Sequence, residues 1–198
     1  MLEEADLKKR FKEASVAICG LGGLGSNIAV ALARAGVGRL HLIDFDRVDV
    51  SNLNRQQYAA AQVGIYKTEA LRENIRAIAP DCEVRTDTIR ITEENAGELL
   101  LDVQIICEAF DDAKSKAMLA NQAAELFPEK YYISGSGMAG LASPNLIKTR
   151  RITKHFYLCG DGVSDIADGT KLFAPRAMLC AAHQATMVLR ILAGELEP

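Results

Sequence analysis

Apolar, strand-like runs alternate with helical patterns along most of the chain. Strands are expected at residues 16–19, 40–43, 83–86, 103–107 and 131–134. Helices are expected at residues 2–13, 67–79, 92–101 and 113–127, and another begins near Ile28. Because strands that alternate with helices form parallel units, the predicted fold class is α/β with a doubly wound, mainly parallel sheet.

The alternation changes near the end of the chain. Residues 145–150 and 155–158 are expected to add an antiparallel pair of strands, and residues 159–170 (CGDGVSDIADGT) to form a mobile loop. A largely apolar helix at residues 175–193 follows. We therefore expect one domain of 198 residues with an added C-terminal part.

Composition excludes several classes of protein. The net charge of −3 provides no basic surface for nucleic acid, and no apolar run is long enough to span a membrane. The first 13 residues are charged and do not resemble a signal peptide. The chain has five cysteines and no C-x-x-C pair, which predicts reduced thiols in the cytoplasm and no cysteine-rich zinc site. The three histidines have no partner spacing and are expected to be structural: His41, His155 and His183.

The most informative stretch is VAICGLGGLGSN at residues 16–27. Its glycines, Gly20, Gly22, Gly23 and Gly25, lie between a buried strand and an apolar helix, as in Rossmann-like folds. Gly20 and Gly22 allow a turn and a close backbone approach that a Cβ atom would block, and Gly25 lets the helix pack on the strand. Backbone N–H groups at such a helix start suit a phosphate, so the stretch predicts a nucleotide site. The alternative is a tight turn without a ligand.

A second polar segment follows the strand at residues 40–43. Asp44 ends this strand, where an acid can hold a ribose through its hydroxyls, although a solvated loop acid is the alternative. The segment from Asp44 through Asp46 to residue 57 is rich in acids and amides, and Arg55 brings a planar guanidinium suited to phosphate. Lys67 begins the next helix within reach of the same face. An ordinary surface loop and a solvated lysine are the alternative interpretations.

Two aspartates follow the strand at residues 103–107. Asp111 and Asp112 come at its carboxyl end, where open α/β sheets bind ligands. Either could be a metal ligand, and Asp112 could equally be the N-cap of the helix that follows.

The charges favour ATP over NAD. A helix N-terminus offers about +0.5 charge, whereas a triphosphate carries about −4. Arg55, Lys67 and a magnesium ion on Asp111 would supply the missing positive charge, since magnesium needs only one or two carboxylates beside phosphate oxygens. A dinucleotide, with about two negative charges, needs less.

Together these motifs resemble the adenylating domain of the ThiF/MoeB and ubiquitin-activating enzymes. The residues that carry the resemblance are GLGGLG at 20–25, DFDRVDVSNLNRQ at 44–56, Lys67 and Asp111-Asp112. Within that family the chain is most similar to ThiF, which adenylates the C-terminal glycine of the sulfur carrier ThiS in thiamine biosynthesis. The resemblance implies that Asp44 holds the ribose, Lys67 contacts phosphate and Asp111 binds magnesium. It also implies a triphosphate site lined by Asn52, Asn54, Arg55 and Gln56.

The family implies partners as well. These are a homodimer and a small ubiquitin-like sulfur carrier whose Gly-Gly tail lies under a crossover loop, here residues 159–170. The nucleotide-binding core would then cover about 14–135 and the carrier-binding region about 136–198. A carrier carboxylate would attack the α-phosphate and release pyrophosphate, so cations rather than an enzyme nucleophile are needed. Arg55, Lys67 and Asp111 are the expected catalytic residues.

Two departures from the family pattern matter. Many members hold zinc on two C-x-x-C pairs, which this chain lacks, so no zinc is expected. Many also have an N-terminal arm whose arginine reaches the partner's ATP. Here the basic residues ahead of the first strand are Lys8, Lys9, Arg10 and Lys12. Cys159 is the best candidate for sulfur transfer because of its expected loop position, although a structural thiol fits equally.

Other functions stay open at this point. MoeB-like activation of a molybdopterin-synthase carrier and a tRNA-modifying dehydratase both use the same adenylation. An NAD-dependent oxidoreductase is compatible with the glycine motif and Asp44. A non-catalytic nucleotide-binding scaffold would follow if the short N-terminus disables the chemistry.

Overall fold

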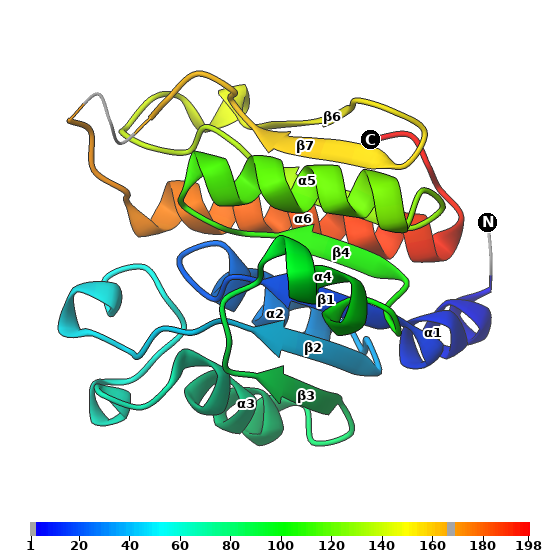
Figure 1. The fold of residues 1–198 in the computed structure, drawn as a ribbon, viewed down its shortest axis with the longest axis horizontal. Coiled ribbons are helices and arrows are strands. Elements are labelled where there is room, and N and C mark those ends of the chain that lie inside the picture. Colours follow the sequence, from blue (N-terminus) through cyan, green and yellow to red (C-terminus); the bar gives the residue numbers. More distant parts are fainter. Residues whose placement is uncertain (1–2, 166–168) are drawn as a thin grey trace.

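The fold is built on one seven-stranded sheet, and the computed structural model describes residues 3–165 and 169–198. The strand order is β3-β2-β1-β4-β5-β7-β6 (Figure 1). Every neighbouring pair is parallel except β6 and β7, which are antiparallel. The predicted α/β class, with antiparallel pairing near the C-terminus, is confirmed. The strands are β1 (Ser15–Cys19), β2 (Arg39–Ile43), β3 (Glu83–Asp87), β4 (Ile105–Glu108), β5 (Tyr131–Gly135), β6 (Lys148–Arg151) and β7 (Phe156–Gly160).

Six α-helices are assigned in the described ranges, close to the positions that the sequence predicts. They are α1 (Glu4–Glu13), α2 (Gly25–Arg34), α3 (Lys67–Ile78), α4 (Glu93–Leu99), α5 (Ala113–Leu126) and α6 (Ala174–Ala193). Three short 3₁₀ turns accompany them: η1 (Val50–Asn52), η2 (Ala60–Gln62) and η3 (Pro144–Leu146). Leu2, in the first predicted helix, lies outside the described residues. No helix among those described combines the length and the apolarity that a membrane crossing requires.

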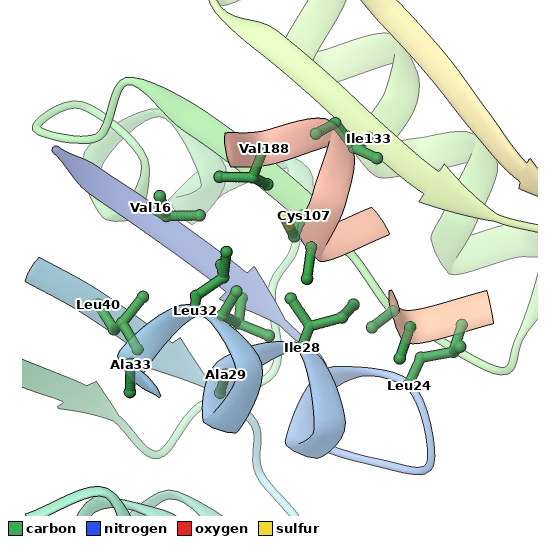
Figure 2. Close-up of a cluster of buried hydrophobic side chains, with 14 of the residues drawn as sticks. Val16, Leu24, Ile28, Ala29, Leu32, Ala33, Leu40, Cys107, Ile133 and Val188 are labelled. Atoms are coloured by element: carbon green, nitrogen blue, oxygen red, sulfur yellow. The ribbon is translucent and has the colours of Figure 1, made fainter. Parts of the chain in front are cut away.

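The sheet is covered on both faces, as its side-chain alternation requires. Val16 and Ile18 of β1 join one core with α2, α3 and α6, whereas Ala17 and Cys19 join another with α4 and α5. Figure 2 shows the first core, where Ile28 of α2 packs with Val16 of β1 and Val188 of α6. Because helices cover both faces, the sheet is doubly wound. The carboxyl ends of its strands are not covered by these helices and are where a binding site can form.

The two C-terminal strands differ from their predicted boundaries. β6 begins at Lys148 rather than 145, because Pro144 starts the η3 turn. β7 continues to Gly160, because Cys159 pairs with Gly135 of β5 and Thr149 of β6.

Cys159 is therefore a buried strand residue, and its expected loop position is wrong. Burial raises the pKa of its thiol to about 11, which opposes formation of a reactive thiolate. The loop after β7 begins at Asp161, and residues 166–168 of the predicted crossover loop lie outside the described residues.

Candidate functional site

A cavity of about 700 Å³ opens at the carboxyl ends of the central strands. The glycine turn after β1 and the turns after β2, β4 and β5 line it. The chain leaves β1 and β4 for opposite faces of the sheet, so the cavity lies at the topological switch point, where open α/β sheets bind ligands.

The glycine turn is shaped by close backbone packing. Gly20 has a φ of +91°, and a Cβ there would lie 2.9 Å from the carbonyl oxygen of Ala109. A Cβ on Gly25 would overlap the carbonyl oxygen of Gly20. Gly22 and Gly23 line the cavity, and a Cβ on either would meet only the side chains of Gln56 or Arg55 at 3.5 Å or more. Gly20 and Gly25 thus fold the turn, while Gly22 and Gly23 leave its cavity side open.

Gly25→Ala should lower the free energy of unfolding by about 3 kcal/mol or more, since the new methyl group has no space beside Gly20. Gly97→Ala is a matched control in α4, where the added Cβ would meet Leu126 at an ordinary 3.4 Å. This control should raise stability by about 0.5–1 kcal/mol. Denaturant unfolding of both variants tests the difference, and equal stabilities would refute the packing role of Gly25.

Asp44 ties the end of β2 to the glycine turn. Its Oδ2 accepts a hydrogen bond from the Leu21 N–H at 2.6 Å, and its Oδ1 accepts one from the Asp46 N–H at 2.8 Å. Burial raises the pKa of this carboxyl, opposed by the nearby Lys67 ammonium and by the two N–H donors. The carboxylate lines the cavity.

Lys67 is held at the cavity wall by Asp46. Its Nζ lies 2.7 Å from the Asp46 Oδ2, and the lysine side chain is only 7% exposed. The backbone N–H of Lys67 also donates to the Asp46 carbonyl at 2.9 Å. Asp46 thus fixes both ends of the lysine, so this ammonium is not a freely solvated surface charge.

Arg55 lies across the glycine turn. Its Nη1 donates to the Ser51 carbonyl at 3.0 Å and to the Asn54 Oδ1 at 2.9 Å. Within the described residues, the buried Nε of Arg55 has no acceptor and the buried Oε1 of Gln56 has no donor. Buried polar atoms without partners are uncommon, so these two atoms are available to a bound ligand.

The amides of this segment divide into two groups. Asn52 and Gln56 line the cavity. Asn54 does not line it and instead holds the guanidinium of Arg55. The side chain of Asn52 also accepts the Asp49 N–H at 3.0 Å, which fixes the η1 turn.

The two aspartates after β4 have different environments. Asp112 is the N-cap of α5, because it accepts the Ser115 N–H at 2.7 Å, and this bond lowers the pKa of the carboxyl. Asp111 and Asp112 are both exposed and both line the cavity. In the described part of the chain no three His, Cys, Asp or Glu side chains cluster as metal ligands. Magnesium is commonly held by one or two carboxylates together with phosphate oxygens, a role that the carboxylate of Asp111 fits.

The histidines each have a partner within the fold. His41 Nε2 lies 2.6 Å from Asp87, His155 Nδ1 lies 2.9 Å from the Pro128 carbonyl, and His183 Nδ1 lies 3.0 Å from Thr149. These contacts agree with structural roles. The basic residues of α1 are distant from the site, since Arg10 contacts the Leu192 carbonyl near the end of α6 that lies farthest from the cavity (Figure 1).

A buried ion pair that no sequence motif indicates lies at the cavity floor. Glu108 is completely buried at the end of β4, and Lys116 Nζ lies 2.9 and 3.0 Å from its two oxygens. The ammonium also donates to the Gly135 carbonyl at 2.8 Å, and the Phe110 N–H donates to Glu108 at 2.6 Å. The pair joins α5 to the ends of β4 and β5. The only sequence signal for this ion pair is an acid directly after an apolar strand, with a lysine eight residues later.

Fold and site together define a Rossmann-like protein with a cavity suited to a nucleotide. The chain belongs to the ThiF family, whose model matches residues 2–198. This result confirms the resemblance that the sequence motifs indicate.

Three curated relatives illustrate the family. The chain is 34% identical over 151 residues to the tRNA threonylcarbamoyladenosine dehydratase of Haemophilus influenzae, covering 75% of this chain and 57% of that protein. It is 40% identical over 132 residues to the probable adenylyltransferase/sulfurtransferase MoeZ of Mycobacterium tuberculosis, covering 66% and 33%. It is 38% identical over 120 residues to the sulfur carrier protein adenylyltransferase of Thermus thermophilus, covering 60% and 44%. The matches therefore span between 33% and 57% of these relatives.

The fold also matches a solved structure. Escherichia coli tRNA N6-threonylcarbamoyladenosine dehydratase, TcdA, solved in complex with ATP, superposes with a TM-score of 0.87 at 23% identity. The match covers 97% of this chain and 90% of that one. At this identity the likeness establishes the fold alone.

Proposed function

We propose that this protein binds ATP and magnesium and adenylates the C-terminal carboxylate of a small protein. The observation that carries the proposal is the convergence of the glycine turn, Arg55, Lys67 and Asp111 on one cavity. These residues come from four separate segments, and an NAD site would need only the first. Adenylyltransferase relatives within the ThiF family support the same chemistry.

The site residues would divide the nucleotide among them. Asp44 would accept hydrogen bonds from the ribose hydroxyls, and the glycine turn would hold phosphate oxygens at the start of α2. Arg55, with Asn52 and Gln56, would contact the triphosphate, and Lys67 would contact a phosphate from the opposite wall. Asn54 and Asp46 would act through the two cations that they position. Gly20 and Gly25 would act by shaping the turn.

The fixed cations would make the reaction feasible. A carboxylate that approaches the α-phosphate meets another anion, and two unit charges 4 Å apart repel by about 4 kcal/mol at an effective dielectric of 20. Arg55 and Lys67 would offset that repulsion, and because they are held in place their effect is largest in the transition state. Magnesium, when bound, supplies further positive charge at the phosphates. Asp111 would hold it.

We further propose a ThiS-like sulfur carrier as the substrate, with a role in thiamine biosynthesis, a homodimeric assembly and a cytoplasmic location. The likeness to the Thermus thermophilus sulfur carrier protein adenylyltransferase supports the carrier class. The carrier-binding region would be the part beyond about residue 135. Action on a tRNA base is the second candidate, because the matched dehydratase aligns over more of this chain than the two adenylyltransferases above do.

Equilibrium binding tests the nucleotide assignment. With magnesium present, ATP should bind at least about tenfold more tightly than NAD⁺, because only the triphosphate uses both Arg55 and Lys67. Isothermal titration with each nucleotide measures the ratio. Tighter binding of NAD⁺ would reject the proposal in favour of an oxidoreductase. Pyrophosphate release that a tRNA substrate stimulates and a ThiS carrier does not would favour the second candidate.

A further inference from the structure

An arginine of α6 is buried beside the cavity without being part of the proposed phosphate site. Arg176 is 5% exposed. Its Nη2 lies 2.5 Å from the Asp161 Oδ2, and its Nε donates to the Met138 carbonyl at 3.4 Å. Its Nη1 donates to the carbonyls of Ala142 and Ser143. One guanidinium thus connects α6, the loop after β5 and the loop after β7.

Asp161 extends this network to the loop after β7. Its Oδ1 accepts the N–H groups of Val163 at 2.9 Å and Ser164 at 2.8 Å, and its Oδ2 accepts the Ser164 hydroxyl. The Asp161 N–H in turn donates to the Gly137 carbonyl at 2.9 Å. A Cβ at Gly137, where φ is +81°, would overlap the Asp161 carboxylate. The two loops are therefore packed against each other through this acid.

The loop that Arg176 holds has unused hydrogen-bond donors. Gly137, Met138 and Ala139 all line the cavity, and across residues 3–165 and 169–198 their backbone N–H groups have no acceptor. Ala139 is only 2% exposed, so water satisfies its N–H poorly. Because unpaired buried N–H groups cost free energy, a bound molecule that offers oxygen atoms would be stabilised here.

We propose that Arg176 and Asp161 are positioning residues that hold residues 137–139 as a cradle for the acceptor carboxylate and the backbone carbonyls of its tail. The inference rests on the proposed function and adds the side from which the acceptor enters. Asp161 neutralises Arg176, so this wall offers N–H dipoles without an excess positive charge. That suits a singly charged carboxylate and an extended peptide rather than a second triphosphate.

The geometry agrees with a tail of small residues. The cradle follows β5, whereas Arg55 and Lys67 both come from the chain after β2, so an acceptor here would approach the phosphates from the far side of the cavity. The Glu108–Lys116 pair lies between the two halves and holds the carbonyl of Gly135, two residues before the cradle begins. A glycine-rich tail leaves its carbonyls accessible to such N–H groups.

The test is Arg176→Lys, which keeps the charge beside Asp161 but loses the planar fork that reaches three carbonyls. The concentration of a ThiS carrier ending in Gly-Gly that gives half-maximal ATP–pyrophosphate exchange should rise about tenfold. The half-saturating ATP concentration should change by less than about threefold. Asp161→Asn should likewise raise the half-saturating carrier concentration without raising that of ATP. It is the second variant if Arg176→Lys does not fold.

Arg190→Lys is the matched control, since Arg190 lies on the same helix and donates to the Glu197 carbonyl at 3.0 and 2.7 Å, away from the cavity. It should change neither constant. Binding of the carrier to the ATP-loaded wild type separates the two hypotheses. If the wild type binds no carrier carboxylate, both the proposed function and the cradle are wrong. If it does and the variants weaken ATP as much as carrier, or weaken neither, only the cradle is wrong.

Discussion

Replacing Lys67 by alanine should lower ATP–pyrophosphate exchange about 100-fold, equivalent to roughly 2.7 kcal/mol of lost transition-state stabilisation. Two effects add in this variant. The ammonium disappears from the cavity wall, and Asp46, now unpaired 2.7 Å from where Nζ was, leaves a negative charge facing the phosphates. Arg55→Ala should have a similar effect, because the Arg55 side chain lies over Gly23 of the glycine turn and also lines the cavity. Radioactive pyrophosphate exchange measures both.

Lys114→Ala is the control for these variants. Lys114 is exposed in the first turn of α5, near the cavity without lining it, so its loss removes the same formal charge from a neighbouring position. Exchange should change by less than about threefold, because exposed charges are screened. Thermal unfolding of each variant checks that the fold is retained. Near-normal exchange in folded Lys67→Ala and Arg55→Ala would remove both residues from the phosphate site.

Exchange should require a partner with a free C-terminal glycine carboxylate, and the protein alone should hydrolyse ATP slowly. The cavity presents cations and N–H groups toward the nucleotide, whereas the fully buried Glu108 is paired with Lys116, Asp44 accepts two backbone N–H groups and Asp46 is paired with Lys67. These acids are engaged and are poor bases for activating water. A carboxylate held in line with the α-phosphate gains the advantage of proximity, which water lacks. Adding carrier should raise exchange by at least about 100-fold.

The sequence brings the residues of the proposed nucleotide site together for a local reason. Its glycines, Asp44 and Lys67 each lie directly at the end or start of a strand or helix, so the order of elements is enough to bring them to one edge of the sheet. Asp112 shows the limit of that reasoning. Its sequence position suits a cap and a metal ligand equally, and only the structure shows the bond to Ser115 that makes it a cap, while its carboxylate also lines the cavity.

The other half depends on contacts between distant residues, which no local pattern reveals. Arg176 and Asp161 are 15 positions apart, and the carbonyls that Arg176 contacts lie more than 30 positions earlier. The predicted loop position of Cys159 is wrong for a related reason. The glycine-rich sequence after it resembles a loop, whereas its backbone pairs with strands on both sides. The role of Glu108 could not be predicted, because an acid after an apolar strand usually reaches solvent. Here it is fully buried, and the ammonium of Lys116 compensates its charge.

The most direct test of the account compares two forms of one carrier. A ThiS carrier with a free Gly-Gly carboxylate and the same carrier with that carboxyl converted to an amide should both be offered to the wild-type protein with ATP and magnesium. We expect ATP–pyrophosphate exchange with the free acid and none above background with the amide, because the amide lacks the attacking oxygen anion. Undiminished exchange with the amidated carrier would show that another group is adenylated and would contradict the account.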